Sequence, residues 1–213
     1  MGFGIALLGY ACLLLDNMGG AAFGAILLGY GLFSASRVCK NFANAAISAL
    51  FMFPRGVLTF LTAFKIIADT SIPVYINYAT YILYIAAWAL MNFFWLIGVI
   101  AIAKENAAES LFKKAKTRLY ISVTFAFVYL AELVLQVSGV SIPTGLGMGI
   151  MICFIFINLI NTLFMHTCFV LITSEKQYAK DLADIANEKA KALEKKEKER
   201  REEAEEIGRR RRR

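Results

Sequence analysis

Long apolar stretches alternate with short polar segments along the chain as far as residue 173. A membrane-spanning helix needs about 20 mostly apolar residues to cross ~30 Å of hydrocarbon. The pattern therefore predicts an all-α integral membrane bundle of six transmembrane helices, arranged as three helical hairpins. The six stretches are 2–15, 21–36, 41–68, 74–103, 119–137 and 143–173.

The first two stretches are short for membrane spans. About 15 residues of α-helix rise only ~22 Å, so we expect either a locally thinned bilayer or burial of these helices among longer ones. The segment 16–20 between them begins with Asp16 and ends in two glycines. Glycine accepts the positive φ angles of tight turns, which predicts a hairpin connection here.

Two other segments depart from a plain apolar helix. Pro54, Arg55 and Gly56 interrupt the middle of the third stretch, and proline inside a helix kinks or breaks it. The linker 104–118 is rich in Lys and Glu with Ala between them. Those residues favour helix formation, so we expect a short surface helix there.

The connections between the stretches alternate between basic and uncharged. Lys and Arg occur in 34–40, in 104–118 and after residue 173, whereas the segments 16–20, 69–73 and 138–142 have none. Because cytoplasmic loops carry the excess of Lys and Arg, six spans place both termini in the cytoplasm. If the third stretch lay flat, the resulting five spans would leave Arg37 and Lys40 on the opposite side.

Composition sharpens this division of the chain. Of the 213 residues, 59% are hydrophobic, against ~45–50% in soluble domains, and the mean hydropathy is +0.60. Residues 1–173 hold 9 Lys and Arg, while residues 174–213 hold 14. We therefore expect a transmembrane domain at 1–173, with the lipid bilayer as its main surroundings, and a charged cytoplasmic tail at 174–213.

The sequence offers little material for catalysis. Its four cysteines lack the close spacing of a metal or redox motif, and it has a single histidine. No nucleophile and base stand out together. We expect no cofactor, no metal and no enzyme activity.

Ionisable residues inside a membrane span are costly and usually have partners. Arg55 and Glu132 each lie about fourteen residues from the cytoplasmic end of their spans, at similar depth. We hypothesise that they form an ion pair. The pair could serve a solute site at a broken helix, or it could only fix the register of two helices; the structural interpretation is the simpler one.

A second set of polar residues consists of Asn92, Asn158, Asn161 and His166. Asn158 and Asn161 are three residues apart and share a helix face. Hydrogen bonding between helices is the default interpretation, and the lining of a pore is the alternative. Four tyrosines recur at every third position of the fourth stretch, and we expect them to anchor it in the headgroup region. They are Tyr75, Tyr78, Tyr81 and Tyr84.

The tail is predicted to be a long charged helix over 174–208. Its apolar residues give only one or two heptads, which favours a membrane-proximal coiled-coil or association segment followed by a solvated single helix. Five terminal arginines could bind anionic lipid headgroups. We predict no nucleic-acid partner, because no aromatic platform or reader fold is evident. The arginines are Arg209, Arg210, Arg211, Arg212 and Arg213.

The first 45 residues carry a glycine-rich pattern. It consists of Gly9-Tyr10, Gly19-Gly20 and Gly29-Tyr30, followed by Ser36-Arg37. This run resembles the opening of small uncharacterised multi-pass membrane proteins of clostridia-like bacteria, although the acidic residue of their second segment is missing here. The resemblance implies a multi-pass topology in a bacterial plasma membrane and no particular activity.

A weak internal repeat accompanies the predicted hairpins. The tripeptide Ser71-Ile72-Pro73 recurs as Ser141-Ile142-Pro143, each time before an even-numbered stretch. It indicates either repeated hairpins, which are common in transporters, or only a favoured way to start a helix.

Two functions follow from these patterns. The first is passage of a small solute or ion through the bundle, as in a transporter or channel, with the polar residues of the spans as candidates. The alternative is a membrane scaffold or sensor whose tail recruits a protein partner, forms a homo-oligomer or binds anionic lipid.

Overall fold

The computed structural model describes residues 2–16, 19–68, 71–140 and 142–171. The predicted tail helix, its coiled-coil segment and its five arginines lie outside these residues. The chain divides into two units, Met1–Phe169 and Val170–Arg213, and the account below concerns the first. Within the described ranges the secondary structure is helical, without a strand, which confirms the all-α class.

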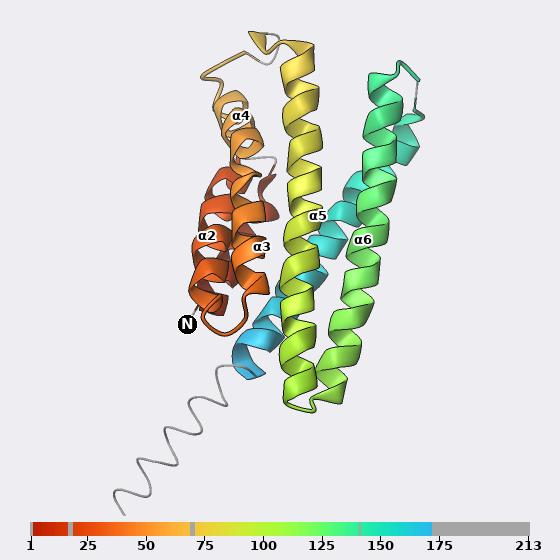
Figure 1. The fold of residues 1–213 in the computed structure, drawn as a ribbon. Coiled ribbons are helices and arrows are strands. Elements are labelled where there is room, and N and C mark those ends of the chain that lie inside the picture. The colour runs from red at the N-terminus through yellow and green to blue at the C-terminus, as the bar shows by residue number, and fades with distance from the viewer. Residues whose placement is uncertain (1, 17–18, 69–70, 141, 172–213) are drawn as a thin grey trace, which may run out of the picture. The chain divides into compact units, whose positions relative to one another are not determined.

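Seven helices make up the described chain (Figure 1). Four segments are long and apolar enough to cross a membrane: 41–63, 74–105, 109–137 and 144–171. The protein is therefore a membrane-embedded helical protein, with two shorter apolar helices at its start. The helices are α1 (Gly2–Leu13), α2 (Gly20–Ala35), α3 (Asn41–Leu50), α4 (Phe53–Ala63), α5 (Val74–Glu105), α6 (Glu109–Val137) and a last helix, Thr144–Leu171.

The linker 104–118 does not form a separate surface helix, contrary to the prediction. α5 continues to Glu105 and α6 begins at Glu109. Between them Ala107 takes a φ of 52°, and the Ala108 N–H donates to the Ala103 carbonyl at 2.9 Å, which ends the helix. Residues with high helix propensity simply extend the two long helices up to a tight turn.

The third apolar stretch is broken, as its proline predicts. α3 ends at Leu50 and α4 starts at Phe53, so that Pro54 lies in the first turn of α4, where its missing N–H costs no hydrogen bond. Gly56 packs against the start of α2 so closely that a Cβ there would overlap the Ala22 backbone. This contact fixes the position of the neighbouring Arg55.

The two short helices α1 and α2 form a tightly packed hairpin. A Cβ on Gly9 would lie 2.6 Å from the Leu28 nitrogen, and such close approach is typical of small residues in membrane bundles. Gly19 has a φ of 79° and turns the chain beneath Phe60 of α4. α2 packs against α3 and α4 on one side, whereas Phe23, Tyr30 and Phe33 on its other side are exposed. The expected burial of the hairpin among longer helices is therefore only partial.

The long helix α5 is the centre of the unit and packs against α3, α4 and α6. Its two tryptophans, Trp88 and Trp95, are fully buried. The last helix passes behind α5 in Figure 1. Its beginning lies near Glu132 of α6, and its Phe169 lies against Gly4 of α1.

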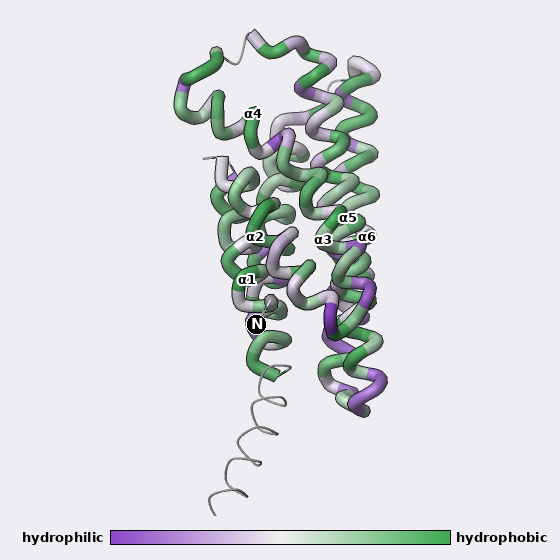
Figure 2. The backbone as a smooth tube through the Cα atoms, turned by 60° about the vertical axis from the view of Figure 1, so that its left-hand side comes forward, coloured by the Kyte–Doolittle hydropathy of each residue, from purple (hydrophilic) through white to green (hydrophobic). Residues whose placement is uncertain are grey.

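The outer faces of the bundle are apolar. Phe127 of α6 is 70% exposed, and Phe156 and Leu163 of the last helix are also exposed. Figure 2 shows long hydrophobic runs along the helices and hydrophilic segments near the turn between α5 and α6. Exposed apolar surface of this extent is typical of a protein whose solvent is lipid.

Candidate functional site

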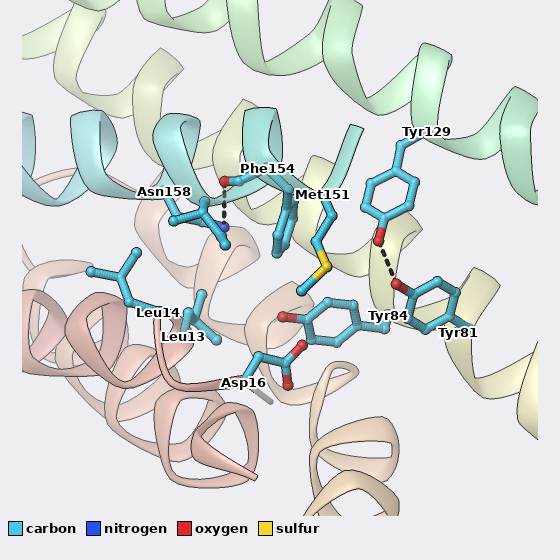
Figure 3. Close-up of a pocket in the computed structure, with 10 residues that line it drawn as sticks. Leu13, Leu14, Asp16, Tyr81, Tyr84, Tyr129, Met151, Phe154 and Asn158 are labelled. Carbon is cyan, nitrogen blue, oxygen red and sulfur yellow. Dashed lines mark hydrogen bonds between the residues drawn. The ribbon is translucent and has the colours of Figure 1, made fainter. Parts of the chain in front are cut away.

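A small cavity lies among the helices next to the tip of the α1–α2 hairpin (Figure 3). We call it the Asp16 cavity; its volume is about 100 Å³. Side chains from the end of α1, from α5, from α6 and from the last helix line it. They are Leu13, Leu14, Asp16, Tyr81, Tyr84, Tyr129, Met151, Phe154, Ile155 and Asn158.

The position of Asp16 follows from the shortness of α1. α1 ends at Leu13, and the Asp16 carbonyl accepts the Gly19 N–H at 2.8 Å to close the turn. The aspartate therefore lies beside Tyr84 of α5, which is ten residues, or about 15 Å, from the start of that helix. The hairpin tip ends inside the helical body rather than at its edge.

Two buried polar atoms at the cavity have no well-aligned hydrogen bond among the described residues, although their side chains interact with each other. They are Oδ1 of Asp16 and the hydroxyl of Tyr84, and Tyr84 is only 1% exposed. The two side chains lie close to each other in Figure 3. Because a buried polar atom without a partner is costly, this pair indicates a place where water or a ligand supplies the missing contacts.

Tyr81 and Tyr129 form the side of the cavity between α5 and α6. Their hydroxyls are hydrogen-bonded to each other, and their rings meet edge to face with centroids 6.0 Å apart. One hydroxyl must donate to the other, so one O–H of the pair stays available to a further acceptor. This contact links the two long helices at the level of Asp16.

Arg55 approaches Tyr81 from α4. Its Nη1 donates to Oδ1 of Asn77, and its guanidinium lies 4.7 Å from the centre of the Tyr81 ring, a cation–π arrangement. Burial raises the pKa of Asp16, which lies in the turn outside the helices, and the Arg55 charge acts in the opposite direction. The arginine thus favours the ionised form of the aspartate.

The structure does not bring Arg55 and Glu132 together as the proposed ion pair. Among the described residues the one ion pair within 4 Å is Lys113–Glu109, and Glu132 accepts a hydrogen bond from Gln136 at 3.1 Å. α4 packs against α2 and α5, so Arg55 meets α5 first. The equal depth of Arg55 and Glu132 predicted that the two side chains lie close together. Depth along a helix, however, does not determine which helices face each other.

The predicted asparagines form a second cluster, which we call the Asn92 network. Oδ1 of Asn92 accepts from Tyr10 at 2.6 Å and from Asn161 at 3.0 Å, and the Trp95 indole donates to the Tyr10 hydroxyl at 2.8 Å. Asn161 also donates to Ser122 at 3.2 Å. These buried contacts connect α1, α5, α6 and the last helix, as hydrogen bonding between helices requires.

The remaining predicted residues separate into two kinds. Asn158 accepts from the Trp88 indole at 2.9 Å and donates to the Phe154 carbonyl, so it connects α5 to the last helix at the edge of the cavity. His166 is exposed and belongs to neither cluster. No three His, Cys, Asp or Glu side chains of the described chain are placed to hold a metal ion.

Sequence reasoning identified Asn158 but missed the other residues that line the cavity. Asp16 reads as an ordinary turn residue beside two glycines, and Tyr81 and Tyr84 read as interface anchors. Of the four tyrosines, Tyr75 is 73% exposed whereas Tyr84 is fully buried, so only part of the row matches the anchor prediction. The signal that was present is Asp16 itself, the first acidic residue of a highly apolar segment.

The fold and the site together define an all-helical membrane-embedded protein with a polar cavity among its helices. Comparisons with protein-family models, with curated proteins and with solved structures found no match. The resemblance of the first 45 residues to small membrane proteins of clostridia-like bacteria therefore stays a prediction.

Proposed function

We propose that this protein carries a small solute or ion across the membrane and binds it in the Asp16 cavity. The observation that supports this most is the carboxyl group of Asp16, which lines a cavity inside an apolar body and has only a poorly aligned contact with the Tyr84 hydroxyl. Ionisable groups at membrane depth are expensive and commonly mark solute or ion pathways. The Asp16 cavity replaces the Arg55–Glu132 pair as the candidate site.

The break between α3 and α4 supports a transport role. Discontinuous helices are typical of secondary transporters, where half-helix ends lie near the substrate site. Here α4 begins with Pro54 and positions Arg55 over Tyr81, next to the Asp16 cavity. The two-residue interruption between α3 and α4 allows α4 to reorient relative to α3. An unbroken helix would not allow this.

The Asn92 network supports a carrier rather than an open pore. Trp88 and Trp95 are fully buried, and their indoles are hydrogen-bonded to Asn158 and Tyr10. These side chains fill the interior of the bundle between the cavity and the C-terminal end of α5. Passage in that direction requires the helices to rearrange, as alternating access does.

We further propose six membrane segments in three hairpins, with both termini in the cytoplasm of a bacterial cell. Phe42, just after the basic segment 34–40, lies against Gly98 near the end of α5, so that segment and the basic turn after α5 share one end of the unit. Phe3 contacts Phe42 as well. This arrangement agrees with the positive-inside rule and places the cavity nearer the outer surface.

The proposal is tested by thiol labelling in intact cells. In a variant without native cysteines, Leu14→Cys introduces a thiol at the cavity, and Leu8→Cys introduces one on the exposed, lipid-facing side of α1. A membrane-impermeant methanethiosulfonate reagent should modify the first from outside and leave the second unmodified. Equal, low reactivity of both thiols would show that the cavity is closed to water and would refute the transport proposal.

The scaffold function remains the second candidate because of one observation, the 14 basic and 11 acidic residues concentrated in 174–213. Such a segment suits a protein partner or an anionic lipid surface. Deleting it tests this directly: a scaffold loses its function while the bundle stays folded, whereas a carrier keeps its solute binding.

A further inference from the structure

We propose that the ligand of the Asp16 cavity is a small protonated amine. This inference rests on the proposed function, since it names the chemical class of the solute held at the same site. It is argued from the free polar atoms of the cavity, from its aromatic walls, from the charges around it and from its size.

Asp16 is the one residue with an ionisable carboxyl group among those that line the cavity. An ionised carboxylate only accepts hydrogen bonds, whereas the tyrosine hydroxyls and the second N–H of Asn158 can donate. Asp16 Oδ1 has no well-aligned hydrogen bond within the described chain. The negative charge of this carboxylate, rather than a lack of donors, favours a cation that brings N–H groups of its own.

The walls of the cavity are aromatic. Tyr84 and Tyr129 each lie near Phe154, with ring centroids 6.4 Å and 5.6 Å apart respectively. The faces of aromatic rings carry partial negative charge and attract ammonium groups. A carboxylate oxygen surrounded by such rings is suited to an alkylammonium ion, whose N–H groups and apolar carbons both find complementary surfaces.

The fixed charges near the cavity favour a single positive charge. Asp16 supplies the one carboxylate that lines the cavity, and Glu132 lies at a different pocket. Arg55 lies over the ring of Tyr81 in a cation–π contact and is not among the lining residues. A monovalent cation at Asp16 would neutralise the carboxylate inside the cavity, which a low-dielectric environment favours.

The size of the cavity limits the ligand. A volume of about 100 Å³ holds several water molecules or a small organic ion. A short alkylamine fits this space. Ethylammonium is therefore a suitable probe.

The experiment measures binding to the full-length chain in detergent by the rise of its melting temperature. Ethylammonium chloride is titrated against sodium chloride at constant ionic strength, with ethanol and sodium acetate as neutral and anionic probes of similar size. We expect a saturable rise with ethylammonium alone, since a ligand that binds the folded state stabilises it. A rise with acetate or sodium, or none with ethylammonium, would overturn the inference.

Variants connect the binding to the cavity. Asp16→Asn should weaken ethylammonium binding by roughly 30-fold or more, because it removes the charged partner of a buried cation. Tyr84→Phe, which keeps the ring and therefore the packing, should weaken it about fivefold. Tyr75→Phe changes an exposed tyrosine of the same helix and should have no effect. Unchanged affinity in both cavity variants would place the amine elsewhere and refute the site.

Uptake of labelled ethylammonium into proteoliposomes separates this inference from the proposed function. Binding without uptake would refute transport while the ligand class stands. Asp16-dependent uptake of another solute, without ethylammonium binding, would refute the ligand class while transport stands.

Discussion

The Asn92 network and the Asp16 cavity are both polar clusters inside an apolar bundle, yet they differ in how their hydrogen bonds are satisfied. Asn92 accepts from Tyr10, Trp95 and Asn161, and its neighbours fill the surrounding space. Asn161 Oδ1 is the one atom of this network without a partner within the described residues. At the cavity, Asp16 Oδ1 and the Tyr84 hydroxyl have no well-aligned hydrogen bond, although their side chains interact with each other. The Asn92 side chain joins several helices, whereas the Asp16 carboxyl group faces open space that a ligand can occupy.

The largest expected effect comes from removing the centre of the Asn92 network. Asn92→Ala leaves the Tyr10 hydroxyl without its acceptor and removes one of two acceptors from both Trp95 and Asn161. It should lower the free energy of unfolding by about 2–4 kcal/mol. Asn44→Ala changes an exposed asparagine of α3 and should shift it by less than ~0.5 kcal/mol. Unfolding in detergent measures both free energies, and similar values would show that the Asn92 network does not hold the helices together.

Two matched tyrosine variants should have intermediate effects on stability, and these two effects should differ in sign. Tyr10→Phe removes a hydroxyl that donates to Asn92 and accepts from Trp95, and should destabilise the protein by about 1–2 kcal/mol. Tyr84→Phe removes a buried hydroxyl whose one polar neighbour, Asp16, is poorly aligned for a hydrogen bond. It should leave the ligand-free protein unchanged or stabilise it by up to ~1 kcal/mol. Both are compared by melting temperature.

Destabilisation by Tyr84→Phe as large as that by Tyr10→Phe would show that the Tyr84 hydroxyl is already satisfied. The contrast between the clusters would then be lost, and the cavity would count as packing.

The smallest effect concerns the pH dependence of stability. Because the pKa of Asp16 is raised in the folded protein, the folded state holds this proton more tightly than the unfolded chain. The resulting stability is fully present below the ordinary aspartate pKa and is lost as the pH rises through the folded value. Asp16→Asn should flatten this decline, measured by melting temperature against pH, whereas Glu109→Gln on the surface should not.

Much of the fold could be predicted from the apolar pattern. The alternation of stretches gave the helices, and Pro54 indicated the break between α3 and α4. The linker 104–118 could not be resolved, because Ala, Lys and Glu favour a surface helix and the ends of two long helices equally. The tight turn that separates these cases depends on Ala107 in a left-handed conformation, which the sequence does not signal.

The candidate site was predictable only in part. Asparagines three apart, such as Asn158 and Asn161, share a helix face by geometry, so hydrogen bonding between helices was a sound expectation. The partner of Arg55 could not be predicted, because a sequence gives the depth of a residue along its helix but not the rotation of that helix about its axis. Asp16 was hidden by local turn chemistry, since its burial depends on how far the short hairpin extends between its neighbours.

The depth of the hairpin tip also has an electrical consequence. Asp16 lies beside Tyr84, about 15 Å along α5, which has 32 residues and so a length of about 48 Å. The voltage falls across the ~30 Å of hydrocarbon, so with α5 centred in this layer Asp16 lies ~6 Å inside it. In the proposed orientation, a monovalent cation that reaches the carboxylate from outside crosses about a fifth of the membrane voltage. Each 100 mV would then change its binding free energy by about 0.5 kcal/mol, so an energised cell would draw the cation inward before any helix moves.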